Sequence, residues 1–211
     1  ALQEVGNIMT GAYLGALSQI AGLRLEPTPP AVGVDFAGAL LGAALAQTGK
    51  IKVGLMLPYT GTFAALGVAI TNGFKLAVEE RGGKLGGREI EYIVVDDESN
   101  PAKAPENANK LIQRDKVDVI IGTVHSGVAM GMAKVIREAG TLWINPNAGA
   151  GAVTGALCAP NIFRTSFSNW QTTHALGKVL KAKGHKNAVF ITWKYAAGEE
   201  MMQGFKEGFE K

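Results

Sequence analysis

Short apolar strands alternate with amphipathic helices from Lys50 onward, and this rhythm constrains the fold most. Apolar runs such as 51–57, 117–121 and 188–192 have the length and residue types of buried strands. Between the runs lie longer segments with helical spacing, and a glycine such as Gly140 ends several of them. Strands that alternate with helices of this length build βαβ units with helices on both faces of a parallel sheet. We therefore predict an α/β fold, a flavodoxin-like doubly wound parallel sheet of five or six strands.

The expected elements follow from the same patterns. Strands are expected at residues 51–57, 89–95, 117–121, 141–145, 161–165 and 188–192, and helices at 64–81, 101–114, 126–139, 171–183 and 198–209. Carboxylates at Asp96, Asp97 and Glu98 precede the second of these helices. We expect them to cap that helix and to interact with its dipole. A metal site or a phosphoacceptor carboxylate is the alternative interpretation.

The first 49 residues follow a different pattern. Residues 2–21 and 35–47 place apolar side chains near helical spacing, and three prolines lie in the connection. The apolar run 36–46 is too short to span a bilayer. Its end, Ala44-Leu45-Ala46, resembles a signal-peptidase cleavage site. We interpret the run as a helix, and a remnant of a signal sequence is the alternative.

Charge and cysteine content narrow the classes of function. The formal net charge is +3, and the whole excess of Lys and Arg follows Lys50. Lysines between 178 and 186 lie at helix ends without interleaved aromatic residues, so we predict a solvated helix face and no nucleic-acid partner. Because Cys158 is the one cysteine, no disulfide can form within the chain.

Polar loops follow three of the predicted strands, where doubly wound sheets bind their ligands. The loops are residues 58–63, 123–127 and 145–149. Their hydroxyls, amides and helix-start N–H groups suit an anion such as a carboxylate. Capping of turns and helices by the same residues is the alternative. His125, His174 and His185 lack metal-ligand spacing, and neither a nucleotide-phosphate fingerprint nor a serine-hydrolase motif occurs, so we predict no metal and no cofactor.

At these loops the sequence resembles a known family, the periplasmic solute-binding proteins of the branched-chain amino-acid (Leu/Ile/Val) type. The similarity spans residues 50–211. It rests on Ile51-Lys-Val-Gly-Leu-Met-Leu-Pro-Tyr-Thr-Gly61, Gly86-Gly-Arg-Glu-Ile90, Asp96-Asp-Glu-Ser-Asn-Pro101, Val119-Ile-Ile-Gly122, Asn161-Ile-Phe-Arg-Thr165 and Lys194-Tyr-Ala-Ala-Gly198. Such proteins are two-lobed receptors that deliver a small ligand to an ABC importer and catalyse nothing. The resemblance implies that residues 50–148 form part of lobe one, that 149–211 begin an incomplete lobe two, and that this part has a periplasmic parent.

The resemblance also implies a set of ligand residues. They are Tyr59, Thr60 and Phe63 in the first loop, Thr123, His125 and Ser126 in the second, Asn147 and Ala148 in the third, and Phe167 and Tyr195 in lobe two. The second loop is expected to hold the ligand carboxylate. Phe167 and the nearby Trp170 have the core as their alternative place. The aromatic residues favour an aromatic acid over an aliphatic amino acid. Without the rest of lobe two we expect weak binding, and exposed apolar edges that predict a homo-oligomer.

Residues 1–47 resemble a different family, the chemotaxis phosphatases of the CheC type. Glu4-x-x-Asn7 followed by Met9-Thr-Gly-Ala-Tyr-Leu14 matches the active-site helix of that family. The resemblance implies that Glu4 and Asn7, one helical turn apart, would act on the phosphoaspartate of a response regulator, and that this part has a cytoplasmic parent. A second copy of the motif does not occur. We therefore predict an engineered or recombined chimera, with a CheC-like helical fragment at 1–49 and impaired solute binding. A CheC-like phosphatase and a binding protein represented only in part are the alternatives.

Overall fold

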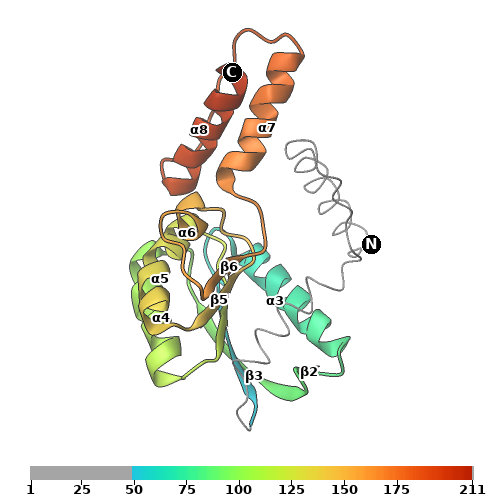
Figure 1. Ribbon diagram of the computed structural model, residues 1–211, viewed down its shortest axis with the longest axis vertical. Coiled ribbons are helices and arrows are strands. Elements are labelled where there is room, and N and C mark those ends of the chain that lie inside the picture. The colour runs from blue at the N-terminus through green and yellow to red at the C-terminus, as the bar shows by residue number, and fades with distance from the viewer. Residues whose placement is uncertain (1–48, 211) are drawn as a thin grey trace. The chain divides into compact units, whose positions relative to one another are not determined.

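The computed structural model describes residues 49–210 (Figure 1). The predicted helices at 2–21 and 35–47, and with them Glu4 and Asn7, lie outside the described residues. Residues 49–84 and 88–210 belong to one compact unit. Within 49–210, no helix combines the length and the apolar character that a membrane crossing requires.

A six-stranded sheet with the order β2-β3-β1-β4-β5-β6 organises this unit. Its strands are β1 (Ile51–Leu57), β2 (Lys84–Leu85), β3 (Arg88–Asp96), β4 (Val119–Ile121), β5 (Leu142–Asn145) and β6 (Ile162–Arg164). β1 pairs in parallel with β3 on one side and with β4 on the other, and the parallel pairing continues through β5 to β6. Leaving aside the short and unpredicted β2, the strand order is that of flavodoxin-like sheets, which confirms the predicted fold class.

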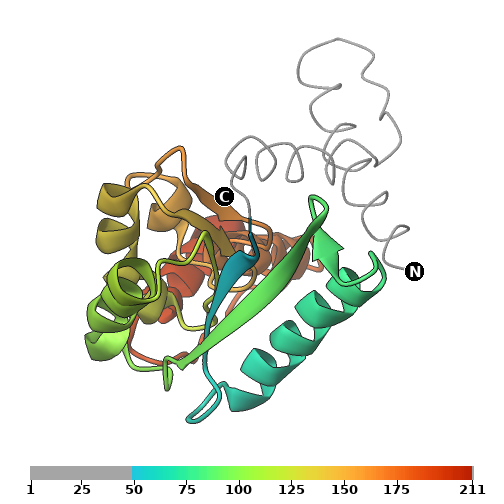
Figure 2. The same ribbon diagram turned by 90° about the horizontal axis from the view of Figure 1, so that it is seen from below.

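Helices cover both faces of the sheet. Figure 2 shows α3 (Ala64–Glu79) on one side and α4 (Ala104–Asn109) and α5 (Ser126–Ala139) on the other. A hydrophobic core lies between the sheet and the helices α4 and α5. It contains Met56, Leu111, Ile120, Val128, Met132, Ile136 and Trp143. The predicted helix over 101–114 is present as a 3₁₀ turn at Pro101–Lys103, α4, and a π-helical turn at Lys110–Arg114. α6 (Gly151–Thr154) is a single turn inside the predicted loop after β5.

The cap of the helical segment 101–114 differs from the prediction. The side chain of Asn100, and not one of the three carboxylates before it, accepts the hydrogen bond from the Ala102 N–H at 3.0 Å. Asp96 and Asp97 instead accept hydrogen bonds from the loops that follow β1 and β4. Glu98 forms an ion pair with Lys103 at 2.7 Å. Capping was therefore the wrong role for these carboxylates, because their strand end faces two neighbouring loops.

α7 (Asn169–Ala182) and α8 (Ala196–Glu210) lie side by side, as Figure 1 shows. Ser168 and Gln171 form a capping box at the start of α7. Glycines allow the two helix backbones to approach closely. A Cβ atom at Gly177 would lie 2.4 Å from the Phe205 carbonyl oxygen, and one at Gly208 would lie 2.1 Å from that of His174.

The predicted strand at 188–192 is absent from the structure. Residues 185–193 carry no regular secondary structure, and Val189 and Ile191 are 88% and 90% exposed. The apolar alternation of a strand is therefore present, but no described strand pairs with it. The prediction was wrong because a strand needs the hydrogen bonds of a neighbour, which a local pattern does not supply.

Paired substitutions in α3 test how closely the helix lies on the first loop. A Cβ atom at Gly67 would lie 1.8 Å from the Pro58 carbonyl oxygen, whereas one at Gly73 would meet nothing within 4 Å. We expect Gly67→Ala to lower the free energy of unfolding by more than about 2 kcal/mol. Gly73→Ala should raise it by up to about 1 kcal/mol, since alanine favours a helix over glycine. Urea denaturation of both variants measures this, and equal effects would contradict the close approach.

Candidate functional site

A pocket of about 400 Å³ opens at the carboxyl edge of the sheet. Its lining comes from the loops after β1, β3 and β4 and from the segment before α8: Thr62, Phe63, Ser99, His125, Trp193, Lys194 and Tyr195. The chain passes from β1 to β3 on one side and returns to β4 on the other, so strand order reverses beside this pocket. Such a reversal is where doubly wound sheets bind ligands. A neighbouring pocket of about 540 Å³ shares Phe63, Trp193 and Tyr195.

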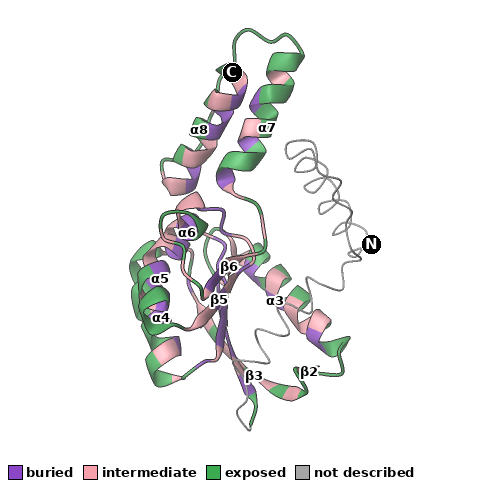
Figure 3. Ribbon diagram, in the orientation of Figure 1, coloured by how far each residue is buried: buried purple, intermediate pink, exposed green. Residues whose placement is uncertain are grey.

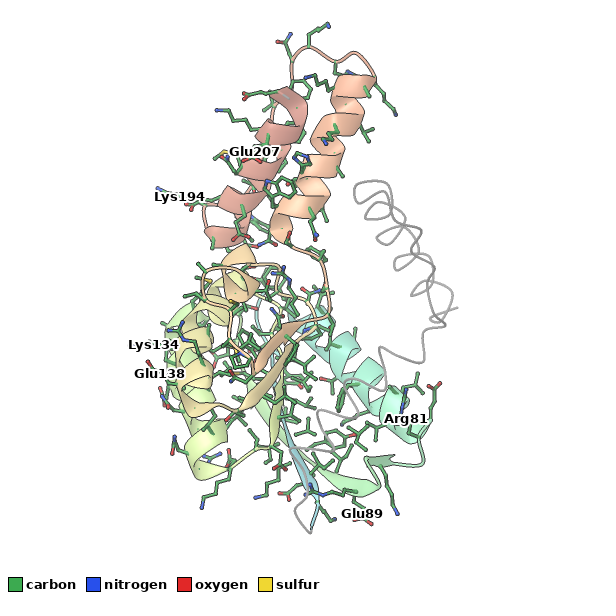
Figure 4. All side chains as sticks on the ribbon, viewed as in Figure 1. Arg81, Glu89, Lys134, Glu138, Lys194 and Glu207 are labelled. Atoms are coloured by element: carbon green, nitrogen blue, oxygen red, sulfur yellow. The ribbon has the colours of Figure 1, made fainter. Side chains whose placement is uncertain are left out.

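Aromatic rings form one wall of the pocket. The ring centroid of His125 lies 5.9 Å from that of Phe63 and 4.8 Å from that of Tyr195. Trp193, which precedes Tyr195 by two residues, is 68% exposed. Figure 4 shows the side chain of Lys194 directed outward. The pocket therefore presents three neighbouring rings, tilted against one another, with a positive charge at its rim.

His125 has a defined tautomer because it caps α5. Its Nδ1 accepts hydrogen bonds from the backbone N–H groups of Gly127 at 3.0 Å and Val128 at 3.4 Å. The imidazole proton is consequently on Nε2, which can donate a hydrogen bond. Burial lowers the pKa of His125, and the negative charge of Asp97 opposes this only in part. The ring is thus a neutral donor at neutral pH.

Asp96 organises the first loop. Its carboxylate accepts hydrogen bonds from the Tyr59 N–H at 2.8 Å and from the Thr60 hydroxyl at 2.6 Å. Burial acts to raise the pKa of Asp96, but these bonds and the Glu98 N–H bond together lower it. The Tyr59 phenol lies 2.7 Å from the Thr71 hydroxyl on α3, and burial raises its pKa. Tyr59 and Thr60 are therefore bonded to Asp96 and Thr71, and they do not line the pocket.

Asp97 joins the loops after β3 and β4. Its carboxylate is fully buried, and it accepts hydrogen bonds from the Thr123 hydroxyl and, at 2.8 Å, from the Ser99 N–H. Burial raises the pKa of Asp97, although both bonds act in the opposite direction. Ser99 has a positive φ of 56°, a conformation that non-glycine residues rarely adopt. Its hydroxyl is buried beside the pocket and has no hydrogen-bond partner among the described residues.

Other predicted ligand residues have partners elsewhere. The Ser126 hydroxyl accepts a hydrogen bond from the Asn169 amide at 3.1 Å, and that amide also donates to Glu200 at 2.9 Å. The buried Ala148 donates its N–H to the Thr123 carbonyl at 3.0 Å. Neither these residues nor Asn147 and Phe167 line the pocket, and a direct ligand role for them stays a prediction.

Of the predicted ligand residues, Phe63, His125 and Tyr195 line this pocket together, and their role in ligand binding stays a prediction. Sequence reasoning missed Thr62, Ser99, Trp193 and Lys194. Proximity to the quoted motifs was the available signal for each of them. No group of three or more His, Cys, Asp or Glu side chains within 49–210 could hold a metal ion.

Comparison with known families identifies the scaffold. Residues 50–211 match the family model described as periplasmic binding protein. The chain belongs to the periplasmic binding protein family. Residues 1–34 match a second model, that of the CheC-like family.

Solved structures and curated relatives of this periplasmic binding protein agree with the assignment. A solute-binding protein of an R. palustris ABC transporter, crystallised in complex with benzoate, is 60% identical with a TM-score of 0.75, over 77% of this chain and 45% of that chain. One from Rhodopseudomonas palustris BisB5, in complex with 3,4-dihydroxybenzoic acid, is 34% identical with a TM-score of 0.71, over 76% and 44%. The Leu/Ile/Val-binding protein BraC3 of Rhizobium johnstonii is 33% identical over 74% of this chain and 43% of its own length. The chain thus spans less than half the length of these relatives.

The neighbouring carboxylates of this periplasmic binding protein should give opposite pH dependences of stability. The pKa of Asp96 is lowered on folding, so its contribution is present above the unfolded-state pKa and is lost as pH falls through the folded one. The pKa of Asp97 is raised, so its charge costs stability as pH rises through the folded-state value. We expect the free energy of unfolding of Asp96→Asn to fall furthest below that of the wild type at neutral pH. That of Asp97→Asn should fall further below the wild-type value at acid pH than at neutral pH. Urea denaturation between neutral and acid pH measures both, and parallel curves would contradict the assignment.

Proposed function

We propose that residues 50–211 bind an aromatic carboxylate of the benzoate type. The observation that supports this most is the wall of rings formed by Phe63, His125 and Tyr195, which suits the face or edge of a planar aromatic ligand. The 60% identical relative, crystallised in complex with benzoate, supports the same ligand class. An aliphatic amino acid would bury its side chain here without ring-to-ring contacts.

Two donors are suited to the ligand carboxylate. The Ser99 hydroxyl is buried at the pocket without a partner among residues 49–210, and such a group is costly to leave unsatisfied. The Nε2–H of His125 is the second, because its Nδ1 is occupied by the start of α5. Lys194 adds a positive charge at the rim. A carboxylate at this place would give Ser99 its missing acceptor.

The proposed activity is binding without catalysis, as in receptors that deliver a solute to an ABC importer. The matched relatives include a solute-binding protein of an ABC transporter, which supports this class and a periplasmic parent for residues 50–211. We expect the affinity of this chain to be impaired, with a dissociation constant above the micromolar range. The reason is that the pocket is built mainly from one lobe, so fewer contacts offset the entropy lost on binding.

We also propose that the chain joins segments of two unrelated families near residue 50. The support is that two family models match separate stretches, 1–34 and 50–211. The match to the CheC-like family is short, and Glu4 and Asn7 lie outside the described residues, so we do not propose phosphatase activity. A natural gene encoding both stretches in this order would contradict the proposal.

A ligand series tests the proposed specificity. We expect benzoate to bind at least about tenfold more tightly than leucine, because ring contacts contribute about 1 kcal/mol or more beyond buried area. Neutral benzamide should bind more weakly than benzoate, since it lacks the charge that strengthens the hydrogen bonds. Calorimetric titration at millimolar ligand measures all three.

Ser99→Ala provides the matched control for this series. It should reduce the difference between benzoate and benzamide while leaving the ranking against leucine in place. Leucine binding as tightly as benzoate would refute the aromatic assignment, and an unchanged benzoate–benzamide difference in Ser99→Ala would refute the carboxylate position.

Substitution of two predicted ligand residues, Phe63 and Phe167, tests whether the ligand binds in this pocket. Phe63 lines the pocket, whereas Phe167 is 39% exposed and does not line it. We expect Phe63→Ala to weaken benzoate binding about tenfold, and Phe167→Ala to change it less than about twofold. Circular dichroism and thermal denaturation check that both variants fold. Equal losses in the two variants would argue against this pocket as the binding site.

A further inference from the structure

The carboxylate of Glu200 on α8 lies where segments far apart in the sequence meet. Its two oxygens accept hydrogen bonds from the Gly151 N–H at 3.0 and 3.1 Å. One of them also accepts a hydrogen bond from the side-chain amide of Asn169, the first residue of α7, at 2.9 Å. The guanidinium of Arg164 on β6 donates to the neighbouring Ala150 carbonyl at 2.9 Å, and its positive charge attracts Glu200. One carboxylate thus joins α8 to the start of α7 and to the loop after β5.

Asn169 extends these contacts to α5. It is only 3% exposed, and the same amide group donates to the hydroxyl of Ser126, the first residue of α5, at 3.1 Å. Ser126 directly follows His125, whose ring lines the pocket. The backbone N–H of Asn169 donates to the Gly149 carbonyl at 2.9 Å. Because buried polar groups are costly to leave without partners, these bonds couple the start of α5 to Glu200.

The same carboxylate is close in sequence to Tyr195. Tyr195 directly precedes α8, and its carbonyl accepts a hydrogen bond from the Glu199 N–H at 3.1 Å. The tyrosine is therefore fixed to the first turn of the helix that carries Glu200. Buried residues lie along both α7 and α8 (Figure 3), so the two helices pack as one unit. Contacts that place α8 against the loop after β5 consequently also place Tyr195.

We propose that Glu200 is a positioning residue for ligand binding, whose bonds to Gly151 and Asn169 hold the ring of Tyr195 against that of His125. This role rests on the proposed function, because it concerns the aromatic wall that would contact benzoate. Glu200 itself is not among the residues that line the pocket. A carboxylate suits the position, since it offers only acceptors and both of these neighbours present N–H donors.

An exchange of the two side chains tests the network. Glu200→Gln turns an amide NH₂ group toward donors, and Asn169→Asp places a second carboxylate beside Glu200. Each single variant should therefore displace α8 from the loop after β5. The double variant Glu200→Gln/Asn169→Asp should restore the arrangement. Its amide at position 200 can donate to the carboxylate at position 169 and still accept from the Gly151 N–H.

The Cε1–H proton resonance of His125 reports the position of the Tyr195 ring without ligand. The two ring centroids lie 4.8 Å apart, so the ring current of Tyr195 shifts this resonance, and Tyr195→Leu gives the value without it. The resonance should move toward that value in each single variant and return toward the wild-type value in the double variant. A loss of stability alone would not move it in the folded protein. An unchanged resonance in both single variants would overturn the proposal.

Benzoate titration measures the effect on binding. Each single variant should bind benzoate about fivefold more weakly, and the double variant within about twofold of the wild type. Glu207→Gln is the control, because Glu207 accepts a hydrogen bond from the Trp170 indole N–H at 3.0 Å farther along α8 (Figure 4). It should retain both the resonance and the affinity.

Two outcomes separate this role from the proposed function. A double variant whose resonance stays displaced, as in the single variants, would overturn the positioning role whatever the ligand. A resonance that shifts and recovers while benzoate affinity stays constant would support the positioning of Tyr195 and refute the pocket as the benzoate site.

Discussion

Backbone hydrogen bonding between parallel strands is the constraint on which the other features of this unit depend. β1 satisfies it on both sides, with β3 paired along its whole length and β4 along its centre. That pairing fixes the carboxyl ends of the strands at one edge and brings together three loops that are far apart in sequence. Phe63, Ser99 and His125 are neighbours because each follows one of these adjacent strands. Residues 186–192 have no such neighbour within the part of the chain that the structure describes, and there a strand-like sequence has formed no strand.

Two adjacent carboxylates, Asp96 and Asp97, hold the loops at this edge, and their pKa values are shifted in opposite directions. Asp96, partly exposed, is bonded by enough N–H and hydroxyl groups to favour its charged form. Asp97 is fully buried, and the cost of burying its charge exceeds the gain from its bonds to Thr123 and Ser99. Together they accept hydrogen bonds from Tyr59, Thr60, Thr123 and Ser99. The hydroxyl of Ser99 and the outer nitrogen of His125 are among the polar groups that line the pocket beside the aromatic rings.

Much of the architecture could be predicted from the sequence because its signals are local. The helix over 126–139 has the predicted bounds, because the spacing of its apolar residues and the glycine that ends it, Gly140, are both visible in the local sequence. The site was harder because hydroxyl partners are decided by tertiary contacts. Thr123 and Ser126 have the residue types of ligand donors, yet they bond to Asp97 and Asn169. Ser99 lies inside a quoted motif, but its place at the pocket was not predicted, because it depends on a left-handed turn after β3 that no residue type there requires.

Residues 186–192 and part of the pocket wall belong to one stretch of chain. Trp193 follows the exposed Val189 and Ile191, and the ring of Tyr195, two residues later, has its centroid 4.8 Å from that of His125 in the pocket wall. A ligand that orders this wall must therefore also restrict a backbone that has no hydrogen-bonded neighbour among residues 49–210, and the entropy lost in doing so reduces its affinity.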